Sequence, residues 1–121
     1  MKYISLKPIV LKANRDFVYF EYDEIIMFEA DGNCSIVYTN GSDFAVKILH
    51  TLSSIEKKYC NEKLCRCHKS YIINLAHLEK LITRKKQAQL KKGLVAKLSP
   101  SWLEKIRQMS GLDRNEVLNL L

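Results

Sequence analysis

The chain has 121 residues, of which 47% are hydrophobic and 27% charged, with only four Gly and two Pro. This length and composition are typical of one packed globular domain and exclude a disordered or low-complexity chain. No apolar run approaches the roughly 18 residues of a membrane span. Because Lys7 and Lys12 interrupt the apolar N-terminal stretch, a signal peptide is not expected either, and we predict a cytoplasmic protein.

The positive charge is concentrated in one third of the sequence. The 20 Lys and Arg residues outnumber the 13 Asp and Glu residues, which gives a net charge of +7. The stretch from Lys63 to Lys97 holds ten basic residues and one acidic residue, Glu79, and carries +9, so the rest of the chain is nearly neutral. This asymmetry favours a polyanionic partner, either nucleic acid or a charged membrane surface. A solvated, solubilising face would explain the charge alone equally well.

Most of the chain up to about residue 98 is predicted to form short strands. Clusters of β-branched and aromatic residues, separated by turn residues, indicate strands at 9–11, 17–20, 25–30, 35–39, 44–49, 64–67, 71–73, 78–82, 88–90 and 94–98. The pair Asn40-Gly41 lies between two apolar runs and predicts a tight hairpin, because both residue types tolerate positive φ.

Two helices and a helical tail are predicted after these strands. Apolar residues recur at helical spacing between 49 and 59, with either Thr51 or Ser53 as the N-cap. The second helix begins at Ser99-Pro100 and ends near Gly111. We therefore expect one domain over residues 1–109 and a leucine-rich helical tail over 110–121. That tail either packs on its own domain or contacts another copy.

The sequence lacks the motifs of common catalytic and metal sites. The glycines are isolated, and the run Cys65-Arg66-Cys67-His68 matches neither the C-x2-C nor the H-x3-H spacing of zinc sites. Cys67 and His68 are neighbours on an extended chain, so their side chains point to opposite faces and form no dyad. A thiol-dependent enzyme would need a depressed Cys67 pKa. We expect no enzyme, no metal and no cofactor.

The stretch from Cys65 to Leu78 places polar and cationic side chains before an apolar strand. Strand alternation predicts Arg66 and His68 on one face, and Cys65, Cys67 and Lys69 on the other, until the chain turns. Such a loop offers hydrogen-bonding groups for both phosphates and base edges. A buried His68, satisfied by backbone groups, is the alternative interpretation.

Four motifs in order resemble the LytTR family of bacterial DNA-binding domains. The run 23–33 is similar to the family's "deI…iEa.gny" segment, 52–56 to its "tL..le" helix, and Leu98-Ser99-Pro100 to the "vS" that leads into its C-terminal segment. The run from Arg66 to Asn74, R-C-H-K-S-Y-I-I-N, is similar to the most distinctive motif, R-v-H-r-S-y-i-v-N. The resemblance extends from about Ile9 to Ile106.

This resemblance implies a mainly β fold and recognition of duplex DNA by loops. About ten short strands would form small antiparallel sheets with one or two short helices. Three loops, at 31–35, 68–70 and 99–102, would face DNA, two in successive major-groove segments and one over the minor groove. The base-proximal residues would be Asn33, Cys34, Ser35, His68, Lys69 and Ser101. The DNA backbone would be contacted by Arg66, Ser70, Arg84, Lys85, Lys86, Lys91, Lys92 and Ser99.

Two features depart from the family pattern. Some members carry His or Arg in the first loop and Arg at the position of Ser101, whereas here the first loop has Asn33 and Cys34. These shorter side chains reach less far toward base edges. The basic residues at 84–86 and 91–92 are expected on two adjoining strand ends, as a phosphate-contacting rim or as a simply solvated hairpin.

The combined interpretation is a sequence-specific regulator of transcription that binds duplex DNA, as a homodimer on repeated half-sites and with no membrane partner. Many relatives carry a receiver domain ahead of this module, so the chain is either a stand-alone regulator, served by a separate receiver or sensor protein, or one excised domain. The alternative function is RNA binding by the basic 63–97 segment. That alternative is weaker because Tyr71 is the only aromatic residue there that could stack on bases.

Overall fold

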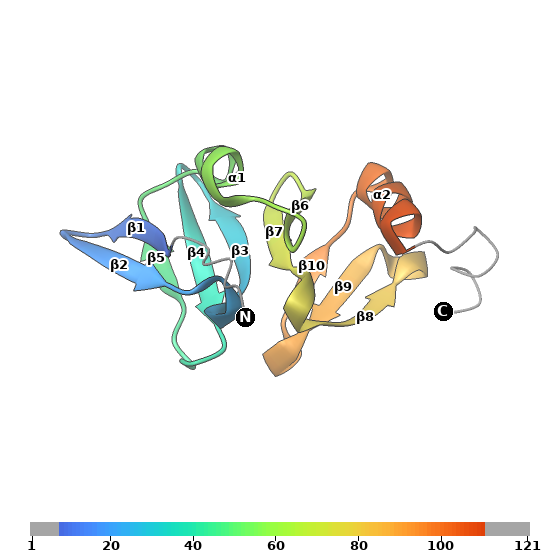
Figure 1. The fold of residues 1–121 in the computed structure, drawn as a ribbon, viewed down its shortest axis with the longest axis horizontal. Coiled ribbons are helices and arrows are strands. Elements are labelled where there is room, and N and C mark those ends of the chain that lie inside the picture. The colour runs from blue at the N-terminus through green and yellow to red at the C-terminus, as the bar shows by residue number, and fades with distance from the viewer. Residues whose placement is uncertain (1–7, 111–121) are drawn as a thin grey trace, which may run out of the picture.

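The computed structural model of the chain describes residues 8–110, in which ten short strands form three antiparallel sheets along the long axis (Figure 1). The two-stranded sheet contains β1 (Ile9–Ala13) and β2 (Asp16–Phe20). The five-stranded sheet has the order β5-β4-β3-β7-β6 and consists of β3 (Ile25–Asp31), β4 (Cys34–Thr39), β5 (Val46–Ile48), β6 (Leu64–His68) and β7 (Tyr71–Asn74). The three-stranded sheet has the order β10-β9-β8 and consists of β8 (Leu78–Ile82), β9 (Gln87–Leu90) and β10 (Val95–Lys97).

Two α-helices and four 3-10 turns complete the described part. The helices are α1 (Leu52–Tyr59) and α2 (Pro100–Ser110), and the turns are η1 (Tyr22–Glu24), η2 (Leu75–His77), η3 (Thr83–Lys85) and η4 (Lys91–Gly93). The predicted fold class, about ten short strands with one or two helices, is confirmed. The predicted tail helix after Gly111 lies outside the described residues. Within residues 8–110, no helix has the length and apolar character needed to cross a membrane.

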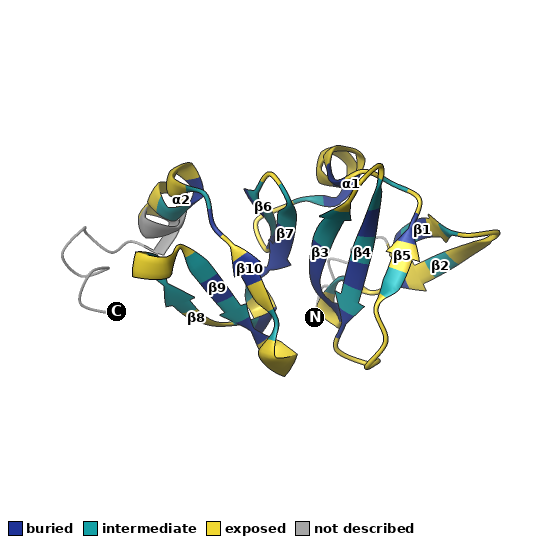
Figure 2. Cartoon of the chain, turned by 180° about the vertical axis from the view of Figure 1, so that it is seen from behind, coloured by how far each residue is buried: buried dark blue, intermediate teal, exposed yellow. Residues whose placement is uncertain are grey.

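The central strand β3 of the five-stranded sheet is buried on both faces, which explains its continuous apolar run. Ile25 and Phe28 of β3 belong to a core cluster shared with β1, β5 and α1. Ile26 and Met27 face a second cluster, formed with the three-stranded sheet and Trp102 of α2. A register shift between Ile25 and Met27 lets residues three apart point the same way. The dark blue of β3 in Figure 2 reflects this two-sided burial.

The prediction of a tight hairpin at Asn40-Gly41 is wrong in detail. β4 and β5 do pair, but the six residues 40–45 connect them, and Gly41 does not adopt positive φ. The tight turn lies one hairpin earlier, where Asp31 pairs with Cys34 and Gly32 has φ of +61°. Because β5 begins only at Val46, the predicted strand at 44–49 is shorter than expected.

Helix α1 starts where a side-chain cap is available. Thr51 Oγ1 accepts a hydrogen bond from the Ser54 backbone N–H at 3.2 Å, so Thr51 rather than Ser53 is the N-cap. The capped helix buries Leu52 and Ile55 against the five-stranded sheet. Its exposed side carries Glu56 toward β6, where Glu56 becomes part of the site described next.

Candidate nucleic-acid interface

Three segments far apart in the sequence meet along one end of the sheets. They are the β3–β4 turn at 31–34, the β6–β7 turn at 68–71 and the start of α2 at 99–101, which together we call the loop edge. The Ala30 N–H donates to the Ser70 carbonyl at 2.9 Å and joins the first two segments. The Ser99 N–H donates to the Cys67 carbonyl at 2.8 Å and joins the third. The sequence-predicted loops therefore lie side by side.

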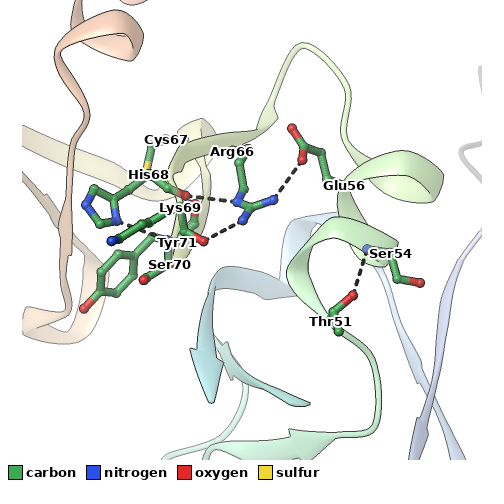
Figure 3. A network of polar contacts seen from close by, with 9 residues as sticks. All are labelled: Thr51, Ser54, Glu56, Arg66, Cys67, His68, Lys69, Ser70 and Tyr71. Atoms are coloured by element: carbon green, nitrogen blue, oxygen red, sulfur yellow. Dashed lines mark hydrogen bonds and ion pairs between the residues drawn. The ribbon is translucent and has the colours of Figure 1, made fainter. Parts of the chain in front are cut away.

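The strand before the second loop contains a bulge that changes the expected facing of its side chains. Arg66 pairs with Ile72 and His68 with Tyr71, so Cys67 is the extra residue. His68 consequently lies beside Tyr71, with ring centroids 5.8 Å apart, whereas Arg66 points the other way, toward α1 (Figure 3). The prediction that Arg66 and His68 share a face is wrong, because the bulge interrupts strand alternation.

Arg66 makes three hydrogen bonds to other residues of the chain. Its Nε donates to the His68 carbonyl at 3.0 Å, its Nη2 to the Lys69 carbonyl at 2.5 Å and its Nη1 to Glu56 Oε1 at 2.8 Å (Figure 3). Two of these bonds fix carbonyl groups of the second loop, and the third ties that loop to α1. The guanidinium therefore shapes the loop, which a more flexible ammonium would not do equally well.

His68 keeps a free hydrogen-bonding group at the loop edge. Its Nδ1 accepts a hydrogen bond from the Ser70 backbone N–H at 3.1 Å, which assigns the ring proton of neutral His68 to Nε2. Burial, and then the positive charges of Lys69, Lys97 and Arg66, lower the pKa of His68 from its usual 6.5. The neutral ring thus offers an Nε2–H donor at pH 7.

The remaining predicted base-proximal residues of the first two loops differ in exposure. Asn33 and Lys69 are exposed at the tips of their turns, and Cys34 is half-buried. Ser35 is completely buried, and its hydroxyl donates to the His50 carbonyl at 2.7 Å. Ser35 is therefore not at the surface, because side chains alternate along β4 and Ser35 lies on its buried face. A contact between Ser35 and a base would require this end of β4 to separate from the sheet.

The third segment is the capped N-terminus of α2. Ser99 Oγ accepts a hydrogen bond from the Trp102 backbone N–H at 3.2 Å and lies 3.2 Å from the exposed Ser101 hydroxyl. Trp102 anchors this turn in the second core cluster. A helix start with the exposed Ser101 hydroxyl at the loop edge suits a phosphate oxygen.

The predicted basic rim is split between opposite ends of one strand. Arg84, Lys85 and Lys86 precede β9 and are exposed, and the Lys86 carbonyl accepts from the Leu98 N–H at 2.8 Å, which places them next to the start of α2. Lys91 follows β9, roughly 17 Å further along at about 3.4 Å per residue. The expectation that both groups occupy adjoining strand ends is therefore wrong, because β9 runs between them.

Lys92 is already engaged within the chain. Its Nζ donates to the carbonyls of Ser42 at 2.8 Å and Thr39 at 3.2 Å, and lies 3.5 Å from Asp43 Oδ1. These contacts link η4 of the three-stranded sheet to the β4–β5 connection. Lys92 thus connects the three-stranded and five-stranded sheets at the end opposite the loop edge.

Sequence reasoning missed Lys97, which adds a cation near His68. Lys97 is exposed on β10, two residues before Ser99, and its charge contributes to the lowered pKa of His68. Its place in the positive segment, directly before the third loop, was the available signal. Together with Lys69, Lys97 adds positive charge to the part of the loop edge around His68.

Burial affects the thiols of three of the four cysteines. Burial raises the pKa of Cys60 and of Cys67 to about 12, and it also raises the pKa of Cys65. The Cys67 thiol donates weakly to the Lys97 carbonyl at 3.4 Å. Over residues 8–110, no group of three or more His, Cys, Asp or Glu side chains is arranged to hold a metal ion. A thiolate at Cys67, which thiol chemistry requires, is disfavoured.

The fold and the loop edge define a small β domain with clustered loops that are flanked by cations. The chain belongs to the LytTr DNA-binding domain family, whose pattern matches residues 15–111.

Two relatives and one solved structure are similar to this chain. The chain is 24% identical, over 89 residues that cover 74% of it, to accessory gene regulator protein A from two strains of Staphylococcus epidermidis. The aligned part spans 37% of the length of each of those relatives. The fold is similar to a structure described as the LytTr DNA-binding domain of a putative methyl-accepting/DNA response regulator from Bacillus cereus. That match has a TM-score of 0.71 at 18% identity and covers 89% of this chain and all of the other.

Proposed function

We propose that this chain is a sequence-specific, duplex-DNA-binding regulator of transcription that reads DNA with its loop edge. The observation that carries the proposal is the pair of backbone hydrogen bonds that holds the three loops in a row, in a chain of a DNA-binding family. The relatives' description as accessory gene regulators supports the regulatory role. Because binding to DNA needs only positioned donors and cations, the proposal involves no catalysis, metal or cofactor.

Direct readout in the major groove is assigned to the second loop. Lys69 is exposed and cationic, and the neutral His68 offers its Nε2–H. Both are donors, so they suit the N7 and O6 acceptors of guanine. Asn33 can donate to and accept from a base, and Cys34 supplies a smaller contact beside it. Two successive major-groove segments are assigned to these two loops.

Phosphate contacts are assigned to residues around them. Ser70 and Ser99 supply donors, and the third loop, with Ser101 as its base-proximal residue, is assigned to the minor groove between the two major-groove segments. Arg84, Lys85, Lys86 and Lys97 supply positive charge beside it. We assign Arg66 to positioning the second loop, and leave Ser35, Lys91 and Lys92 out of the DNA contacts for the structural reasons given above.

We further propose that two copies act together on repeated half-sites, in the cytoplasm. Because the aligned segment spans only 37% of the curated relatives, a receiver or sensor unit, on the same or another chain, is proposed to supply the signal. RNA binding is less well supported. Tyr71, the aromatic residue of the positive segment, is half-buried and its hydroxyl donates to Glu29 Oε2 at 3.2 Å, so its ring is not presented for base stacking.

The test is selection of duplexes from a randomised DNA library at about 0.15 M salt, where purely electrostatic binding is weakened. We expect a recovered motif, and we expect Lys69→Ala to bind motif and scrambled duplexes with a reduced ratio of affinities. Lys91→Ala is the matched control and should retain the wild-type ratio. Failure to enrich any motif, with preferential binding of single-stranded RNA, would overturn the proposal.

A further inference from the structure

The strand β2 has a free edge whose only charged residue is Asp16, at its first position. Among the described strands it pairs with β1 alone, in a regular register without a bulge. Its residues Asp16–Phe20 include no Pro and no Lys, which commonly guard edges. The edge strand β8, by contrast, carries Glu79 and Lys80 and has an irregular register between Leu78 and Lys80.

The outer face of β2 also carries two large aromatic side chains. Phe17 is 67% and Tyr19 69% exposed, while Val18 between them packs against the first core cluster. The β1–β2 ribbon projects from the end of the molecule farthest from α2, and its exposed colour is clear in Figure 2. An unpaired edge and an exposed aromatic pair thus occur together on a projecting ribbon.

We propose that β2 pairs with β2 of a second copy of this chain, antiparallel and in the register centred on Val18. In this register Phe17 lies opposite the partner's Tyr19, and Tyr19 opposite the partner's Phe17. At both ends of the pairing, Arg15 of the β1–β2 turn then lies next to the partner's Glu21, which directly follows β2. The twofold arrangement therefore makes two aromatic cross-strand pairs and two pairs of opposite charge.

The backbone geometry selects the same register. In an antiparallel ladder, alternate residues bond the neighbouring strand, and the others turn their N–H and C=O outward. With Ala13 opposite Asp16 across a two-residue turn, the outward residues of β2 are Phe17 and Tyr19. These are the residues that the Val18-centred register places opposite each other, so their free N–H and C=O groups can bond reciprocally.

Neighbouring registers are less favourable. A shift by one residue would place the exposed Phe17 opposite the inward-facing Val18, which mixes the two faces of the sheet. Centring the pairing on Phe17 or on Tyr19 keeps the faces matched, but it removes the Arg15–Glu21 pairs. The Val18-centred register alone satisfies facing, aromatic pairing and charge.

This inference names the interface of the homodimer proposed above, and so deepens the proposed function. It does not depend on DNA binding, because none of the proposed DNA contacts lies on β2. The two can therefore fail separately. Self-association is measured without DNA, and binding to a duplex with one half-site tests the loop edge alone.

The first experiment is sedimentation equilibrium of the full chain, with a small interface expected to give a monomer–dimer equilibrium over roughly 10–500 μM. Phe17→Lys should weaken self-association at least about tenfold, because it places a charge on the paired edge. Phe44→Lys is the control, since Phe44 is 82% exposed in the β4–β5 connection. Wild-type protein that stays monomeric, or equal effects of both variants, overturns the proposal.

The second experiment tests the register with charge exchange. Arg15→Glu and Glu21→Arg should each weaken self-association, because each places like charges opposite each other at both ends. An equimolar mixture of the two variants should regain wild-type association, since opposite charges then face each other across a mixed pair. Thermal melts check that each variant is folded. If folded variants fail to complement each other, the Val18-centred pairing is refuted.

Discussion

The role of Arg66 gives the sharpest test of how the loop edge is built. If its guanidinium holds the second loop in shape, Arg66→Ala should lower both the stability of the domain and its affinity for cognate DNA. If instead it contacts a phosphate, only binding should fall. The guanidinium contacts two loop carbonyl groups and the Glu56 carboxylate.

The size of the stability loss follows from these contacts. Each of the two bonds to a loop carbonyl contributes about 1 kcal/mol net. The Glu56 pair is partly exposed, with side-chain exposures of 21% and 44%, so it adds only about 0.5 kcal/mol. The sum is about 2–3 kcal/mol, which corresponds to a fall in Tm of roughly 10 °C for a domain of this size.

Two variants separate the contributions in thermal melts and DNA titrations. Glu56→Gln should cost about 0.5 kcal/mol, because it removes the ion pair and leaves both carbonyl bonds. Arg66→Lys should behave closer to Arg66→Ala than to wild type, since an ammonium cannot make the forked contacts. Unchanged Tm for Arg66→Ala, together with a salt dependence of DNA binding reduced by about one phosphate contact, would refute the positioning role.

Three further results are expected. The double variant Lys85→Ala/Lys86→Ala should weaken binding to all duplexes alike and lower the slope of log affinity against log salt concentration by about 2. Lys91→Ala should leave both the affinity and this slope unchanged. Equal slopes for the double variant and Lys91→Ala would contradict the division of the basic rim. The pKa of His68 is lowered in the folded chain, so the unfolded chain binds the His68 proton more readily. The contribution of His68 to stability is therefore fully present above pH 6.5 and is lost as the pH falls below it. Urea melts of wild type and His68→Gln should converge toward acid pH, and a His68 pKa at or above 6.5 measured by NMR would exclude this. With its pKa raised to about 12, the Cys67 thiol should resist alkylation at pH 8 until the chain unfolds, and rapid labelling of the folded protein would contradict its burial.

Local chemistry in the sequence was sufficient for the class of fold and for the position of the loops along the chain. Short β-branched and aromatic runs predicted the strands, and Ser99-Pro100 predicted the start of α2, because capping and strand formation depend on neighbouring residues. The motif around His68 similarly identified the second loop. The resemblance of this motif to the LytTR family also led to the expectation of DNA binding. Composition and charge alone did not distinguish nucleic acid from other polyanionic partners.

Only the tertiary structure decided which of the candidate residues are available to DNA. The bulge at Cys67 turned Arg66 toward Glu56, and burial of the β4 end removed Ser35 from the surface. β9 separated the two basic clusters, and Lys92 found carbonyl partners about 50 residues away along the chain. These outcomes depend on strand register and on contacts between distant segments. A sequence pattern records which residues are neighbours along the chain, whereas pairing and burial decide which way each side chain points and what it meets there.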